Sequence, residues 1–444
     1  MSTAPVATAT AAPPASAAAQ QSAAQPPARA GKPTLLARAT STTPRTLRLL
    51  LVLTAVAAVL FGLFAQQAGA LQARAAAEAR EQSAQIVGVQ EVRNLLVDAN
   101  AIAANTFLVG GLEPADQREE FTSSVQAAAA QLATLSSSEP RDAEALAAVA
   151  RDLTTYSGLI EQARANNRQG FPVGSAYLDQ ASAVLTAEDG VLADLNELVE
   201  TGADRVASAY DTVRWSVLLL VGSLAMLLLM VGAQIWLARR THRYLNRPLA
   251  TATVLLLVLG IAGGVAFGTT SSNAAAVRGD SYRATLAVSQ ALTAASEAKS
   301  LESFTLIKRG SGAALEAQFQ ASATEATTKL QDGVDEGIVD TALVTELEAW
   351  LELHRAIREA DDGGTWERAV QLAVSTEPDS ANVAFAAFQE DAKKAVEDGA
   401  TTTRATLGTW GAISSIASWI LLAAGLVGAG LAWRGVSQRL EEYR

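Results

Sequence analysis

The chain has 444 residues, of which 50% are hydrophobic and only 18% are charged, and its mean hydropathy is +0.19. This composition is unusual for a soluble protein of that length and favours a membrane protein. The absence of cysteine and the presence of only two histidines, His242 and His354, exclude thiol chemistry, disulfides and most imidazole catalysis. The net charge of −11 argues against nucleic acid as a partner.

The first residues form a low-complexity mixture of Ala, Pro, Thr, Ser and Gln. Such a segment has too few large apolar side chains to offset the entropy lost on ordering. We expect residues 1–46 to be a disordered cytoplasmic tail.

Four apolar runs are long enough to cross a bilayer, which takes about 20 helical residues. They are residues 47–65, 215–237, 250–268 and 412–433. None carries a charged residue in its interior, which disfavours a transport pathway through this chain alone. Ala68, Gly69 and Ala70 also fit a signal-peptide cleavage site, but the long region before the first run favours a retained anchor.

Charges orient the four crossings. The 238–248 loop contains four arginines and no acid, and two more arginines follow the fourth run. By the positive-inside rule this loop, the 434–444 tail and the N-terminus are cytoplasmic. Residues 71–213 (net charge −12) and 271–409 (net charge −10) would then lie outside the cell. The arginines that we single out as a candidate cytoplasmic interaction surface are Arg239, Arg240, Arg243, Arg247, Arg434 and Arg439.

Both outer segments have helical periodicity. A heptad-like seam typical of coiled coils is formed by Val92, Leu95, Ala99, Ile102 and Thr106. Because no Pro or Gly cluster interrupts residues 71–108, the first membrane helix is predicted to continue outward as one rod. Breakers at 110–114, Pro140 and 170–172 then divide the first segment into four helices, and the second segment divides similarly at 310–312, 333–337, 363–364 and Pro378.

Similar residues recur between the two segments. Phe121 matches Phe319 at a shift of 198, and Tyr156 matches Trp350 at a shift of 194. We interpret this as an internal repeat. The predicted fold is therefore an all-α membrane protein with four transmembrane helices and two extracytoplasmic four-helix-bundle domains, internally duplicated.

Few residues suggest chemistry. His354 lies beside Arg355 and Arg358 on a predicted helix, and we expect it to be solvated or hydrogen-bonded locally. We assign no catalytic, cofactor-binding or metal-binding residue, and expect no cofactor and no enzyme activity. Direct sensing of a small molecule by the outer segments stays open, although no convergent basic cluster indicates an anionic ligand.

Small residues indicate helix contacts in the membrane. Gly260, Gly264 and Gly268 recur every four residues in the third run, and Gly425 lies in the fourth. This spacing allows close helix approach within the chain or in a homodimer; glycines that simply face lipid are the alternative.

The cytoplasmic segments are too short to bury a core, so a separate protein must read any signal. Leu440 and Tyr443 lie three residues apart on one face of residues 438–444, which we interpret as a docking handle. The arginines alternatively only fix the topology and bind anionic lipid of the bilayer.

Three motifs carry a family resemblance: NTFLVGGLEP at 105–114, SLESFTLIKRGSG at 300–312 and RGVSQRLEEYR at 434–444. They resemble the actinobacterial GlnX family. That resemblance implies four membrane helices and a link between a GlnH-like solute-binding lipoprotein outside and a PknG-like soluble Ser/Thr kinase inside. It assigns no ligand-contact residue. The favoured function is a transmembrane signal relay for amino-acid sensing; the alternative is an accessory or scaffolding subunit of a transporter or cell-envelope complex.

Overall fold

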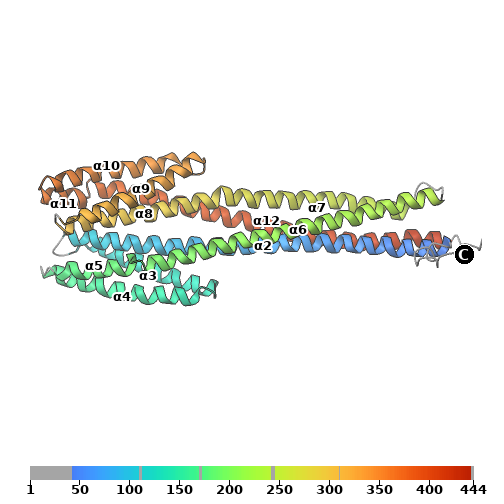
Figure 1. Ribbon diagram of the computed structural model, residues 1–444, viewed down its shortest axis with the longest axis horizontal. Coiled ribbons are helices and arrows are strands. Elements are labelled where there is room, and N and C mark those ends of the chain that lie inside the picture. Colours follow the sequence, from blue (N-terminus) through green and yellow to red (C-terminus); the bar gives the residue numbers. More distant parts are fainter. Residues whose placement is uncertain (1–42, 110–112, 170–172, 242–245, 310, 442–444) are drawn as a thin grey trace, which may run out of the picture.

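A computed structural model describes residues 43–109, 113–169, 173–241, 246–309 and 311–441, and within them the chain is helical with no strand. The helices, labelled as in Figure 1, are α2 (Thr43–Val109), α3 (Ala115–Ser138), α4 (Ala143–Arg168), α5 (Val173–Thr186), α6 (Val191–Thr241), α7 (Arg247–Gly279), α8 (Ser281–Ile307), α9 (Ala313–Asp335), α10 (Thr341–Asp362), α11 (Trp366–Val374) and α12 (Ala381–Glu441). The predicted helical class is confirmed.

The molecule is a long rod with two unlike ends (Figure 1). At one end only α2, α6, α7 and α12 run side by side. At the other end α3, α4 and α5 lie on one side of the central helices, and α9, α10 and α11 lie on the other. The predicted continuous first rod is confirmed, because α2 runs unbroken for 67 residues.

Four helices are long and apolar enough to cross a membrane. The candidate spans are Arg48–Val109, Trp215–Arg239, Arg247–Thr269 and Ala381–Gly435. Each contains one of the four runs expected from the sequence, so the chain is compatible with a multi-pass membrane protein.

The four-helix end has its own apolar core. Phe61 of α2, Met230 of α6, Leu256 of α7 and Leu421 of α12 are buried in it. Large apolar side chains such as Leu228 face outward on the same helices. A helix that is apolar on all sides fits a lipid environment, where both faces meet apolar neighbours.

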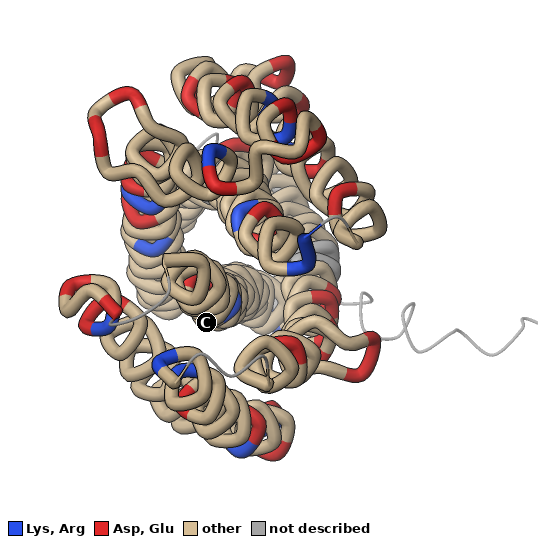
Figure 2. The backbone as a smooth tube through the Cα atoms, turned by 90° about the vertical axis from the view of Figure 1, so that its left-hand side faces the viewer, with Lys and Arg blue, Asp and Glu red and all other residues tan. Residues whose placement is uncertain are grey.

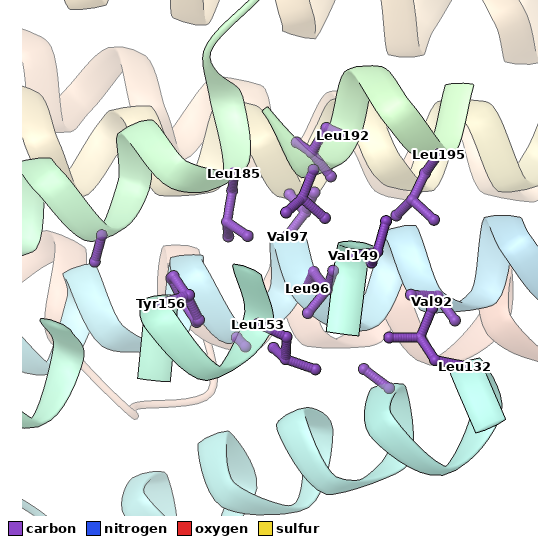
Figure 3. Packing of buried hydrophobic residues seen from close by; sticks show 14 of the residues in the cluster. Val92, Leu96, Val97, Leu132, Val149, Leu153, Tyr156, Leu185, Leu192 and Leu195 are labelled. Carbon is purple, nitrogen blue, oxygen red and sulfur yellow. The ribbon is translucent and has the colours of Figure 1, made fainter. Parts of the chain in front are cut away.

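A second core is shared by α3, α4, α5 and the adjoining parts of α2 and α6. We call this set of helices the first outer group. Figure 3 shows side chains of this core from α2, α3, α4, α5 and α6 pointing toward one another. Examples are Val92 and Leu96 of α2, Leu132 of α3 and Leu195 of α6. The apolar positions repeat every three to four residues, so each helix buries one face.

The second outer group contains α8, α9, α10, α11 and the adjoining part of α12 around a third core. Trp350 of α10 is fully buried there, against Phe319 of α9 and Phe385 of α12. The two groups also share side chains, because Phe304 of α8 packs into the first core and Leu108 of α2 packs into the second. The outer groups are therefore joined along α2 and α8.

One break was not expected. The sequence analysis divided the first segment into four helices, but α5 ends at Thr186 and α6 begins at Val191. A turn closes between them, in which the Gly190 N–H donates to the Ala187 carbonyl at 2.9 Å. Acidic residues at 188 and 189 followed by glycine favour such a turn, so this local signal was present and was missed.

Candidate functional site

The contact between α2 and α8 is a seam of short polar side chains. Asn94 donates from Nδ2 to Ser289 Oγ at 3.2 Å and accepts from the Thr293 hydroxyl. Six residues further out, Asn100 Nδ2 donates to Ser300 Oγ at 2.9 Å. The residues that hydrogen-bond across this seam, Asn94 and Asn100 on α2 and Ser289, Thr293 and Ser300 on α8, are all buried.

A polar seam behaves differently from an apolar core. Hydroxyl and amide groups can exchange one partner for another, whereas interlocked apolar side chains must repack to shift. The side-chain oxygen of Asn100 in this seam also lacks a direct partner. A buried polar atom without a partner costs free energy, so this contact holds the two groups together less firmly than a fully hydrogen-bonded one would.

Asp98 connects α2 to the second outer group by charge. It is 6% exposed and accepts from Gln389 Nε2 at 2.7 Å and Lys393 Nζ at 3.3 Å, both on α12. The same stretch of α2 that holds the seam therefore also contacts the helix that returns to the four-helix end.

A buried ionic cluster lies beside the seam in the second outer group. Lys299 Nζ lies 2.5 Å from Glu302 Oε1, and His354 Nδ1 lies 2.8 Å from Glu302 Oε2. The other ring nitrogen of His354 lies 3.5 Å from Glu316 Oε1, and the ring stacks on Phe319 at 3.6 Å between centroids. The expectation of a solvated or locally bonded histidine was wrong, because His354 is 2% exposed and its partners lie on α8 and α9.

The protonation of this cluster follows from its geometry. Burial alone would lower the pKa of His354, but hydrogen bonds and attraction to Glu302 and Glu316 outweigh it and raise the pKa. Burial would raise the pKa of Glu302, but the opposing Lys299 and His354 lower it. Only a protonated imidazole donates from both ring nitrogens to two carboxylates, so this geometry favours the imidazolium form of His354.

The first outer group places a different cation against the corresponding phenyl ring. The guanidinium of Arg164 lies 4.2 Å from the centroid of the Phe121 ring. It pairs with Glu113 at 2.8 Å and Glu161 at 2.7 Å. Phe121 also lies against Tyr156, with ring centroids 6.2 Å apart.

Residues 75–211 match the family model of the actinobacterial sensor domain. We call this stretch the sensor-like segment; it runs from the middle of α2 to the outer part of α6 and contains the whole first outer group. Neither a curated protein nor a solved structure matches the chain. The match indicates a sensing or signalling role of an actinobacterial type.

Three of the basic residues expected on the cytoplasmic side, Arg239, Arg247 and Arg434, are exposed. They lie in the parts of α6, α7 and α12 that form the four-helix end, remote from the sensor-like segment. Asn246, which the sequence analysis did not single out, donates from Nδ2 to the Gly435 carbonyl at 2.8 Å. This bond joins the start of α7 to the last part of α12, so these two helix ends lie side by side.

Other predicted members of the candidate cytoplasmic interaction surface cannot be placed. Arg240, Arg439 and Leu440 lie in helices whose side chains at these positions are outside the described set, and Arg243 and Tyr443 lie outside the described residues. The docking handle therefore stays a prediction.

The glycines of the four-helix end differ in what surrounds them. A Cβ on Gly425 would lie 2.8 Å from the Ala58 carbonyl oxygen and from the Cα of Gly62, so α2 and α12 approach closely there. A Cβ on Gly260 would meet the Phe61 ring at 3.2 Å. Gly264 and Gly268 have no atom within 4 Å of that position. These two positions make no close contact inside one chain, which leaves lipid or a second copy as their neighbour.

Acidic side chains dominate the outer end, as Figure 2 shows for both outer groups. Within the described residues, however, no set of three or more His, Asp or Glu side chains could hold a metal ion. The acidic surface is therefore better suited to solvation or to a partner with a complementary charge than to a metal centre.

The sequence analysis did not find the ionic cluster. A signal existed, because Lys299 and Glu302 have the spacing of neighbours on one helix face in a stretch otherwise made mostly of Ala, Ser and Leu. A charge pair in such surroundings indicates a paired, buried position.

Proposed function

We propose that the protein is a non-enzymatic transmembrane signal relay. The observation that carries this proposal is continuity: α2, α6 and α12 are single helices of 67, 51 and 61 residues that belong both to the outer groups and to the apolar four-helix end. A stiff helix transmits a displacement along its axis, because its backbone hydrogen bonds resist bending. The similarity of residues 75–211 to a sensor domain supports the outer groups as the input.

The proposal includes an internal duplication into two four-helix bundles. In this scheme α2 corresponds to α7 with α8, α3 to α9, α4 to α10, α5 to α11 and α6 to α12. The aromatic pairs Phe121–Tyr156 and Phe319–Trp350 occupy matching places in the two copies. The hydrogen bonds between α2 and α8 join residues 195, 199 and 200 apart. A pseudo-twofold axis along the α2–α8 seam produces such pairing of near-equivalent positions.

The relay would work by a shift between the two copies. A partner that binds one arrangement of the outer groups better than another moves the population toward it. Coupling of about 1–3 kcal/mol is enough to change occupancy severalfold. The exchangeable hydrogen bonds of the α2–α8 seam permit such a shift, and the long helices carry it to the basic surface around Asn246 and Gly435.

The partners we propose follow from the GlnX resemblance. A GlnH-like solute-binding lipoprotein would contact the outer groups, and a PknG-like Ser/Thr kinase would contact the basic surface. Both termini would be cytoplasmic, with the acidic outer groups outside. Membrane crosslinking followed by identification of the captured proteins tests this assignment: a lipoprotein outside and a kinase inside support the relay, while an ATPase and a permease support the accessory-subunit alternative.

Topology is tested with single cysteines in a chain that has none. Ser137 and Asp379 are exposed on the outer groups, and Arg239 is exposed at the other end. An impermeant thiol reagent on intact cells should label Ser137→Cys and Asp379→Cys but not Arg239→Cys. The opposite labelling pattern would place the outer groups in the cytoplasm and would contradict the proposed direction of the signal.

A seam lock tests the motion itself. Asn94→Cys with Ser289→Cys can be joined across α2 and α8 by a short bifunctional thiol reagent. The matched control joins Glu91→Cys to Gln131→Cys, which contact within the first outer group at 3.0 Å. We expect the seam lock to abolish the kinase response to extracellular amino acid, and the control lock to leave it. Equal signalling by both locked proteins would show that the seam does not move.

A further inference from the structure

A cavity of about 430 Å³ lies between the two outer groups. Its walls come from α2, α5 and α6 on one side and from α8 and α9 on the other. This volume is within the range of small-molecule sites in proteins, which often form where two domains meet.

One residue of the cavity lining has a buried hydrogen-bond acceptor without a donor. Asn100 is 2% exposed, and its Nδ2 donates to the hydroxyls of Ser182 at 3.2 Å and Ser300 at 2.9 Å. Its Oδ1 is buried without a direct partner. A buried acceptor without a donor costs free energy, which a ligand that donates a hydrogen bond would recover.

The charges of the lining are unbalanced. The described lining contains two carboxylates, Asp179 and Glu297, and one ammonium group, that of Lys308. Lys308 pairs with Asp179 at the more exposed side of the cavity. Glu297 is mostly buried; burial raises its pKa, while attraction to Arg93 lowers it and repulsion from Glu325 raises it. Within the described lining the two carboxylates therefore outnumber the ammonium group by one.

Part of the wall is apolar. Val97, Leu185, Leu192 and Phe304 are buried and line the cavity. A ligand that fits this wall has a hydrocarbon or aromatic body in addition to a charged end.

We propose that this cavity binds a small primary amine with an apolar body, whose ammonium group is held by Glu297 and by the amide oxygen of Asn100. An ammonium group supplies both the missing charge and the missing donor. The ligand would contact α2 and α8 together, so its binding would favour one arrangement of the seam. This site does not depend on the relay or on a protein partner, because it is defined by residues of this chain alone.

Three probes that share a phenylethyl body separate the chemistry. Phenethylamine carries the ammonium group, 2-phenylethanol is its neutral analogue, and 3-phenylpropionate is its anionic analogue. Isothermal titration of the full-length protein in nanodiscs should show the amine binding at least tenfold more tightly than either analogue. Equal binding of the alcohol would show an apolar cavity without a charge site, and tighter binding of the anion would assign recognition to Lys308; either result overturns the proposal.

Matched variants place the bound amine. Glu297→Gln keeps the shape of the side chain and removes the charge, so amine affinity should fall at least tenfold. Glu348→Gln removes an exposed carboxylate that lies outside the lining, so affinity should stay within twofold. Amine binding that Glu297→Gln leaves unchanged, or that both variants weaken equally, would contradict the site.

A second variant guards against misfolding of Glu297→Gln. Ala321 is exposed and lines the cavity, so Ala321→Trp obstructs it from the surface without touching the core. The amine should no longer bind at the wild-type affinity, while the thermal unfolding profile stays unchanged. Wild-type affinity in this variant would show that the amine binds elsewhere.

Discussion

Each outer group places a cation against a buried phenyl ring, and the cation differs between the two groups. In the first group Arg164 lies over the Phe121 ring and pairs with Glu113 and Glu161. In the second, His354 stacks on the Phe319 ring and lies between Glu302 and Glu316. A guanidinium group stays charged at every physiological pH, whereas an imidazole does not.

The two groups therefore differ in the chemistry of the cation that lies against the phenyl ring. The second group depends on the protonation of His354 and adds Lys299 to the same buried cluster. We therefore expect the second group to respond more strongly to pH and to loss of a single charge.

The largest effects should come from the central aromatic side chains. Trp350→Ala removes a fully buried ring that contacts Phe319 and Phe385. We expect a loss of about 3–5 kcal/mol in the stability of the second group, seen as faster hydrogen exchange in α9 and α10. Tyr156→Ala should have the corresponding effect in α3 and α4. If either variant speeds hydrogen exchange equally in both groups, the groups unfold as one cooperative unit and cannot be compared separately.

The next largest difference in stability between the two groups should come from the loss of one carboxylate charge. Glu302→Gln leaves the buried ammonium of Lys299 without its carboxylate, which should cost roughly 3 kcal/mol because an uncompensated buried charge is unfavourable. Glu161→Gln in the first group removes a carboxylate that is 51% exposed and should cost less than about 1 kcal/mol. Chemical denaturation of the two variants measures the difference. Comparable losses would mean that the cluster is hydrated and not a buried network.

The membrane end offers a test with a smaller expected effect. Gly62 and Gly260 are 198 residues apart, but only Gly62 lies against another glycine, Gly425. Gly425→Val forces α2 and α12 apart and should destabilise their contact by about 1–3 kcal/mol. Gly430→Val is the control, because its Cβ would meet no atom within 4 Å. Crosslinking yield between α2 and α12 measures the contact, and an equal yield in both variants would contradict the close approach.

The smallest effect should be the response to pH. Because the folded-state pKa of His354 is raised above 6.5, its stabilisation is full below that value and is lost as pH rises through the folded-state pKa. The pKa values of Glu302 and Glu316 are lowered below 4.5, so their contribution is lost as pH falls below that value. The protection factors of amides in α8 and α10, taken relative to the intrinsic exchange rate at each pH, should therefore be highest between about pH 5 and 6.5. His354→Gln should remove the alkaline limb, and a limb of unchanged size in that variant would refute the role of this residue.

The sequence predicted the helical class, the four apolar crossings and the unbroken α2, because these features depend on local periodicity and on the length of apolar runs. It missed the turn before α6 and the burial of His354. The histidine was misjudged because its partners Glu302 and Glu316 lie 52 and 38 residues away, and no local pattern reports which helix faces which. The cavity beside Asn100 could not be predicted from the sequence for the same reason, because its lining comes from α2, α5, α6, α8 and α9.

The central claim is that a change at the outer groups reaches the basic end through continuous helices. Spin labels on Arg239→Cys and Arg434→Cys report the distance between the ends of α6 and α12, and both positions are exposed. The distance distribution should be measured by double electron–electron resonance in nanodiscs, with and without the amino-acid-loaded GlnH-like lipoprotein. The relay predicts a shift in the distribution when the lipoprotein binds. An identical distribution, with binding shown by co-sedimentation of the same sample, would contradict it.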